Sequence, residues 1–280
     1  MCQYYVIDKD RGYELSLRAT LIRDQSKKIF WSVNGSAIHN KNKLLKISNA
    51  LKAYNETSDS ELDKEPNTDG KKSEVNRPRV RYVEGASMNS IWVNHSLGID
   101  PATGKEIFVT DWSSANYVIG GCTDSKVEGT FGSNFTWKGL SLNMTFRYRI
   151  GGQMYNQTLV DKVQDVDPRY NVDKRAFEQR WQEPGDKVRF AAFRTELNGI
   201  NVAYVTRPTS RFVEDYNYLE LATLNLSYEF GTAKLQRCGI KRLKAMFYMN
   251  DVFHVSNVKQ ERGIDYPFAR NFSIGLQARF

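Results

Sequence analysis

The feature that most constrains the fold is a strict alternation of side chains in the segment 271–280. Every second side chain is apolar, and the residues between them are small or polar. Because successive side chains of a β-strand point to opposite faces, this period of two predicts a strand with one apolar and one polar face. The apolar positions are Phe272, Ile274, Leu276, Ala278 and Phe280.

Six further segments alternate in the same way, each over about 10 to 15 residues. Ordinary strands average ~5–6 residues, whereas membrane-spanning strands need ~9–11. The first, third and fifth connections are short and the others are longer, as in outer-membrane barrels with tight periplasmic turns and long external loops. We therefore predict an all-β fold, an antiparallel transmembrane β-barrel, present here as a partial barrel of about seven to eight long strands. The predicted strands are 12–23, 29–39, 127–137, 140–150, 216–230, 241–250 and 271–280.

An odd number of strands is unusual for such a barrel. Single-chain bacterial barrels use an even number of strands, and an open sheet edge in lipid leaves backbone groups unpaired. We expect either an unrecognised strand or, because no export signal follows Met1, the C-terminal part of a larger barrel. Within the loops, the segments 43–54 and 172–181 are expected to form short helices.

The composition excludes several other classes. The 40 basic and 32 acidic residues are mixed along the chain, so the net charge of +8 does not indicate a nucleic-acid surface, which needs a basic stripe on one element. No apolar run reaches the ~18 residues of a membrane helix. The mean hydropathy of −0.57 favours a soluble protein, but membrane strands give a weak hydropathy signal. A soluble β-sandwich with shorter strands is the alternative fold.

No arrangement of residues indicates an enzyme. Asp165 and Asp167, or Asp111 beside Trp112, have the residue types of a glycosidase pair, which requires two carboxyls ~5–9.5 Å apart. The three histidines are far apart and lack the H-E-x-x-H spacing. The three cysteines show no zinc or disulfide spacing. We expect no catalytic residue, no metal site and no cofactor.

The polar face of the predicted strands would line a barrel lumen. Arg147 and Arg149 either meet a polar or anionic substrate there or only hydrate the interior. In the first long loop, Trp112 and Tyr117 either stack on sugar rings or only pack the loop. The lumen-facing candidates are Arg147, Arg149, Glu229, Lys244, Tyr248 and Arg279.

Several stretches carry a family resemblance. Lys9–Leu17 resembles a strand start N-x-G-Y-E-L, and Gly98–Gly104 is similar to a loop G-L-D-P-x-T-G. Pro208–Tyr228 resembles S-R-F-V-E-D-x-S-Y-L-R-L-x-N-L-T-L-G-Y, with Glu220 where Arg is usual and Asn217 where a small residue is usual. Met249–Phe253 looks like G-Q-N-L-F, and Tyr266-Pro267 with Phe272–Leu276 looks like Y-P…F-T-L-G-L. These are landmarks of SusC/RagA-type TonB-dependent outer-membrane transporters of the Bacteroidetes, over residues 9–280.

The resemblance implies a function in the cell outer membrane. It implies import of oligosaccharides or peptides, energised by the TonB complex through an N-terminal plug region that is expected to be absent here, with a SusD-like lipoprotein as a lid. Outer-membrane lipid and the barrel-assembly machinery are the other implied partners, and no nucleic acid is expected. A soluble or secreted β-sandwich that binds glycans is the alternative function. The implied C-terminal assembly signal consists of Phe272, Ile274, Leu276 and Phe280.

Overall fold

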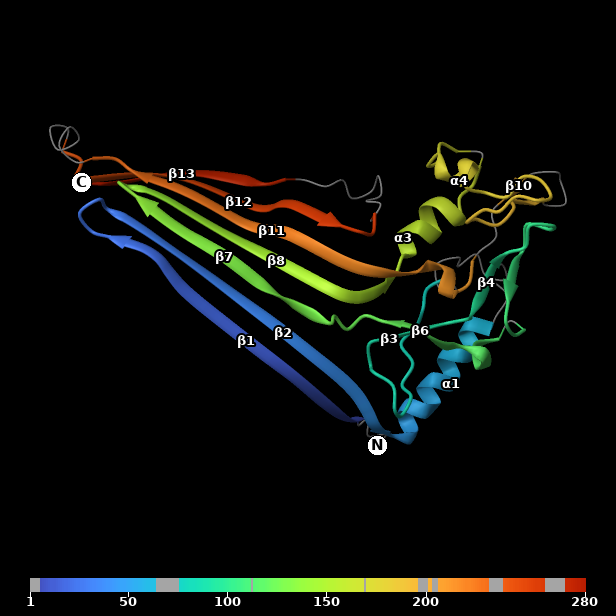
Figure 1. Cartoon of the computed structure of the whole chain (residues 1–280). Coiled ribbons are helices and arrows are strands. Elements are labelled where there is room, and N and C mark those ends of the chain that lie inside the picture. Colours follow the sequence, from blue (N-terminus) through green and yellow to red (C-terminus); the bar gives the residue numbers. More distant parts are fainter. Residues whose placement is uncertain are drawn as a thin grey trace.

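The main element of the structure is an antiparallel sheet of seven long strands, which crosses Figure 1 as a curved layer. The computed structural model describes residues 6–63, 76–111, 113–168, 170–195, 201–202, 206–231, 239–259 and 270–280. The strand order is β1-β2-β7-β8-β11-β12-β13, so the long strands pair in the order in which they occur along the chain. Their bounds are β1 (Val6–Asp24), β2 (Ile29–Ile47), β7 (Val127–Trp137), β8 (Leu140–Tyr155), β11 (Val213–Glu229), β12 (Arg242–Ser256) and β13 (Phe272–Arg279).

The predicted fold class is confirmed: the chain is mostly antiparallel β-sheet, consistent with a partial barrel. In the described part of the chain, β1 pairs only with β2 and β13 pairs only with β12. The sheet is therefore open, with β1 and β13 as its edges.

The two ends of the sheet differ in their connections (Figure 1). At one end, short turns join β1 to β2 and β7 to β8, and at the other end β2 and β8 lead into the helices and short strands of the long loops. The turn between β7 and β8 consists of Lys138 and Gly139, with φ angles of 46° and 94°. Two consecutive positive φ angles are the signature of a type I′ turn, whose twist matches that of the flanking strands. We call the two ends the turn end and the loop end.

Cross-strand register gives the sheet one apolar and one polar face, because directly paired residues share a face. Both faces can be followed across all seven strands. One row of paired residues is apolar throughout: Ile22, Trp31, Phe135, Leu142, Leu226, Phe247 and Ile274. A row on the opposite face is polar throughout: Thr20, Ser32, Asn134, Asn143, Asn225, Tyr248 and Ser273.

The apolar face is open rather than packed into a core. Leu17 is 66% exposed and Ile274 is 77% exposed. The buried apolar clusters of the described residues lie instead in the loops and at the loop end of the strands. The largest comprises Leu159, Val160, Val163, Val166, Ala176, Phe190 and Phe212.

The long loops form a layer at the loop end of the sheet (Figure 1). Residues between β2 and β7 form α1 (Asn49–Asp63), β3 (Ser90–Val93), β4 (Ser96–Ile99), β5 (Glu106–Phe108), η1 (Ser114–Asn116) and β6 (Val118–Cys122). Residues between β8 and β11 form α3 (Gln157–Leu159), η2 (Val160–Gln164), α4 (Arg175–Glu178), β9 (Arg194–Thr195), β10 (Asn201–Val202) and η3 (Ser210–Phe212).

Both loop helices differ from the sequence prediction. The segment 43–54 is not one helix, because β2 continues to Ile47 and places Leu44 in a buried cluster. Ser48 then ends the strand and caps α1, accepting a hydrogen bond from the Leu51 amide at 3.4 Å. In the segment 172–181 only Arg175–Glu178 is helical. After this helix, the backbone of Gln179 and Trp181 forms hydrogen bonds with the backbone of Phe190.

Among the described residues, no helix has the length and apolar character needed to cross a membrane.

Candidate functional site

The polar face of the sheet collects all six lumen-facing candidates. Arg147 and Arg149 lie on β8, Glu229 on β11, Lys244 and Tyr248 on β12, and Arg279 on β13. Register places them on one face, because Arg147 pairs with Glu220, Glu229 with Lys244, and Arg279 with Arg242. Whether this face lines a lumen stays a prediction.

Several charged residues of this face form ion pairs with one another. Arg147 Nη2 lies 2.8 Å from Glu220 Oε1 and 3.9 Å from Asp251 Oδ1. Glu220 Oε2 in turn lies 3.9 Å from His254 Nδ1, and the His254 ring stacks on Tyr218 at a centroid distance of 5.2 Å. Arg149 Nε lies 3.9 Å from Glu128. These pairs neutralise part of the positive charge on the polar face.

A groove opens at the loop end, where β8 passes into α3. Its volume is about 500 Å³, and it is bounded by the segment 77–80, the segment 88–91 and the end of β8. Arg77, Arg79, Tyr155 and Gln157 are among its lining residues. Arg77 lies 3.8 Å from Asp161, which also accepts a hydrogen bond from Gln157 Nε2 at 2.9 Å. The groove therefore combines apolar walls with Arg77 and Gln157, both of which contact Asp161.

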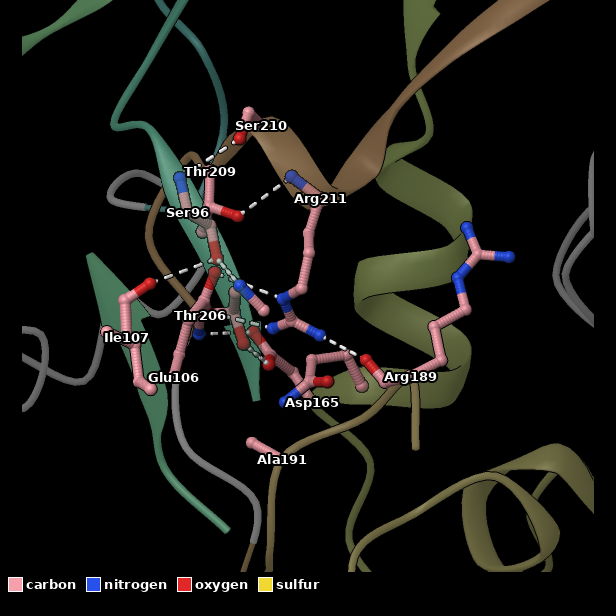
Figure 2. A network of polar contacts seen from close by, with 12 residues as sticks. Ser96, Glu106, Ile107, Asp165, Arg189, Ala191, Thr206, Thr209, Ser210 and Arg211 are labelled. Atoms are coloured by element: carbon pink, nitrogen blue, oxygen red, sulfur yellow. Dashed lines mark hydrogen bonds and ion pairs between the residues drawn. The ribbon is translucent and has the colours of Figure 1, made fainter. Parts of the chain in front are cut away.

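The loop layer is held to the sheet by a polar network, which Figure 2 shows from close by. At its centre, the guanidinium of Arg211 binds both carboxylate oxygens of Glu106, from Nε at 3.0 Å and from Nη2 at 2.8 Å. Arg211 Nη1 also donates to the Arg189 carbonyl at 2.5 Å. Arg189 itself forms an ion pair with Glu214. The stretch 210–215 thus ties β5 and the 189 loop to the start of β11.

A second part of the network centres on Asp165. Thr206 donates to both oxygens of this carboxylate, from its amide at 2.8 Å and from its hydroxyl at 2.6 Å. Burial nevertheless raises the pKa of the Asp165 carboxyl to about 7, because the cost of desolvating the charge outweighs these two hydrogen bonds. Both oxygens already bond Thr206, an arrangement that suits a structural carboxyl better than one of a glycosidase pair.

Arg180 is a buried cation that sequence reasoning did not identify. Its guanidinium donates to four backbone carbonyls, those of Val163, Gln164, Ala176 and Ala191, at 2.7–2.8 Å. Burial lowers its pKa to about 10, and the nearby Asp165 carboxylate opposes part of that shift. The side chain joins η2, α4 and the segment at Ala191, and three of its four acceptors lie 11 to 17 residues away, so no local pattern marks it.

The two loop residues proposed for sugar stacking have different outcomes. Trp112 lies outside the described residues. Tyr117 is only 7% exposed and packs with Trp92, Val83 and Ala86. Burial raises its pKa above the usual range of a tyrosine. In this structure the Tyr117 ring packs within the loop layer, and a role in sugar stacking stays a prediction.

Among the described residues, no group of three or more His, Cys, Asp or Glu side chains is arranged to hold a metal ion.

The sequence predicts a C-terminal assembly signal made of four aromatic or aliphatic residues of the last strand. All four are strongly exposed, with 63–77% of their surface accessible: Phe272, Ile274, Leu276 and Phe280. Their exposure leaves that role a prediction.

Comparison with known proteins gives matches to solved structures only. No protein-family model and no curated protein matches the sequence. The structure of the RagAB peptide transporter matches with a TM-score of 0.64 and 18% identity, over 97% of this chain and 29% of the other. The RagAB peptide importer in its open-open state gives a TM-score of 0.68, with 18% identity over 98% and 29% of the two chains. Its closed-closed state gives 0.66, with 18% identity over 97% and 29%.

These matches establish the fold. The chain spans about 29% of the length of the solved chains that it resembles. At 18% identity, the shared feature is the arrangement of strands rather than any particular binding residue.

Proposed function

We propose that this chain forms part of the wall of a transmembrane β-barrel in an outer-membrane importer. The observation that carries the proposal is the exposed apolar face, which continues in register across all seven strands. A soluble sheet would hide such a face against a second layer. A two-sheet sandwich would bury the apolar face between its sheets, whereas Leu17 and Ile274 are exposed to solvent in the described structure.

The height of the apolar face agrees with a membrane. On β1 it runs from Tyr13 to Ile22, paired with His39 and Trp31 on β2. Nine residue steps at ~3.3 Å span ~30 Å along the strand. A strand tilt of ~40° reduces this to ~23 Å, close to the ~25 Å apolar band of outer-membrane barrels. We call this stretch of the apolar face the apolar belt.

We infer that the open edges β1 and β13 pair with further strands in the working protein. Unpaired backbone groups in lipid cost several kcal/mol each. In this arrangement the polar face lines the lumen and the loop end is external. The chain then acts as a component of a transporter and not as an enzyme.

Peptides are the substrate class that the comparisons favour, since the similar solved structures are described as a peptide transporter and importer. Oligosaccharides remain the second candidate from the sequence resemblance. A SusD-like lipoprotein at the loop end and energy supplied by the TonB complex complete the proposal. The groove lined by Arg77, Arg79 and Tyr155 is a candidate contact for cargo on that side.

The proposal is tested by scanning the environment of one strand. In a background without native cysteines, single cysteines at consecutive positions of β1 from Glu14 to Ala19 are labelled with a polarity-sensitive fluorophore in lipid vesicles. We expect lipid-like emission at Leu15, Leu17 and Ala19 and water-like emission at Glu14, Ser16 and Arg18. Uniform water-like emission, with the protein folded in plain buffer, would reject the barrel.

A further inference from the structure

We propose that four cations at the outer ends of β1 and β2 form a binding surface for the phosphate groups of membrane lipids. This inference rests on the proposed function, because it requires that the apolar face meets lipid and that the loop end is external. The surface consists of Lys9, Arg11, Lys41 and Lys43, which we call the basic patch.

The position of the basic patch follows from register. On β1 the odd-numbered residues from Lys9 to Ala19 share one face, because no bulge interrupts the pairing between Asp8 and Thr20. This is the apolar face, which carries Tyr13, Leu15 and Leu17. Arg11 and Lys9 are therefore the next two outward side chains beyond Tyr13, at the edge of the apolar belt on the side of the loop end.

The cations face one another directly across the two strands. Arg11 pairs with Lys41, and Lys9 pairs with Lys43. All four side chains are exposed, and within the described residues no ion pair joins any of them to a carboxylate. Like charges directly opposite each other destabilise a strand pair. An external anion would relieve that repulsion.

The chain has carboxylates at this position but directs them to the other face. Asp8 and Asp10 alternate with Lys9 and Arg11, and both accept hydrogen bonds from Asn42 Nδ2, at 3.2 and 2.8 Å. Asn42 lies on the polar face, paired with Asp10. Negative charge is thus sorted to the lumen side and positive charge to the side of the lipid.

Protection of a sheet edge does not explain the patch. Lysines on an exposed edge strand discourage pairing with other chains, and β1 is an edge of the described sheet. Lys41 and Lys43, however, lie on β2, which pairs with β1 on one side. On its other side, next to Lys43, Leu44 exchanges two backbone hydrogen bonds with Gly85 and Ala86. Lipid phosphates at the boundary of the apolar belt fit all four positions, because the headgroups lie where the hydrocarbon layer ends.

The test compares two matched double variants of β1. Lys9→Gln/Arg11→Gln removes two cations from the outward face. Arg18→Gln/Arg23→Gln removes two exposed cations from the polar face of the same strand, where they pair with Asn34 and Phe30. The readout is the apparent Kd of a phosphatidylglycerol probe for the full protein in neutral detergent micelles, with phosphatidylcholine as the uncharged reference. Insertion into vesicles is measured first for each protein.

We expect the outward variant to bind phosphatidylglycerol on the order of tenfold or more weakly, at about 1 kcal/mol per cation, while the polar-face variant binds like the parent. Raising the ionic strength should weaken binding by the parent more than binding by the outward variant, which keeps only Lys41 and Lys43. Adding Lys41→Gln/Lys43→Gln should extend the loss.

Two outcomes would overturn the inference in distinguishable ways. If all proteins insert into vesicles but bind both lipids equally, the basic patch is not a lipid surface and the barrel proposal stands. If the outward variant loses a co-purifying acidic protein while its lipid affinity is unchanged, the patch is a protein interface. Failure of the parent to insert would reject the barrel proposal itself.

Discussion

Arg211 and Glu106 are 105 residues apart in the chain and form a two-point ion pair, with each side chain only 11% exposed. The pair joins η3, immediately before β11, to β5 in the loop layer. Parallel N–H···O bonds from a guanidinium to a carboxylate are the strongest form of such a contact. Its partial burial makes the loss of one partner costly, since the other charge remains desolvated.

We predict that Glu106→Gln loosens the loop layer by about 3 kcal/mol, the lower end of the range for a broken buried pair, because the site is not fully enclosed. Hydrogen exchange of residues 94–111 measures this. Glu229→Gln is the matched control, because its ion pair with Arg242 is exposed to solvent and contributes little to stability. Equal effects of the two variants would contradict a special role for Arg211.

The Asp165 carboxyl predicts a pH dependence of the same layer. Its pKa is raised to about 7 in the folded protein, against about 4 in an unfolded chain. The folded state therefore holds this proton more tightly, and the contribution of Asp165 to the free energy of unfolding falls as pH rises from about 4 to about 7. Above that window it stays constant.

The corresponding measurement is hydrogen exchange at Thr206, corrected for the intrinsic effect of pH on exchange. We expect more opening at about pH 8 than at about pH 5, and Asp165→Asn should remove this difference. Asp100→Asn is the control: hydrogen bonds from Thr103 and Ala102 lower the pKa of Asp100 below its usual range, so its titration lies under the window. A trend that survives Asp165→Asn would assign it to another group.

The two faces of β1 predict opposite responses to a new charge. Leu17→Lys places a cation near the middle of the apolar belt, at a cost of about 2–4 kcal/mol. Ser16→Lys places the same charge on the polar face, where we expect little change. Urea unfolding in vesicles and the amount of assembled protein measure both, and similar losses for the two variants would argue against a lipid-facing surface.

Gly129 is a position where the sheet has no room for a side chain. A Cβ atom there would lie 2.0 Å from the backbone oxygen of Ser36 on β2. We predict that Gly129→Ala forces β2 and β7 apart and costs about 1–3 kcal/mol. At Gly275 the nearest atom is the flexible end of Met246, at 3.3 Å, so Gly275→Ala should be nearly neutral. Thermal unfolding in detergent distinguishes the two.

The strands could be predicted from the sequence because their signal is local. Alternation marks both faces, and the two-residue turn Lys138-Gly139 fixes one hairpin. The loop layer could not be predicted in the same way. Its contacts join distant residues, such as Arg211 with Glu106 and Arg180 with the carbonyl of Val163. The stretch 210–215 resembles a family motif in the sequence, but only the structure shows that Arg211 and Glu214 are its anchoring side chains.

The separation of charge at the outer end of β1 has a consequence for assembly. Asp8, Lys9, Asp10 and Arg11 alternate in sign, and the residues that follow alternate in polarity. A slip of one residue against β2 would move Leu15 and Leu17 to the polar face and Asp8 and Asp10 to the apolar face. In the barrel wall proposed above, such a misaligned hairpin would be destabilised both by apolar side chains in the lumen and by carboxylates facing lipid phosphates.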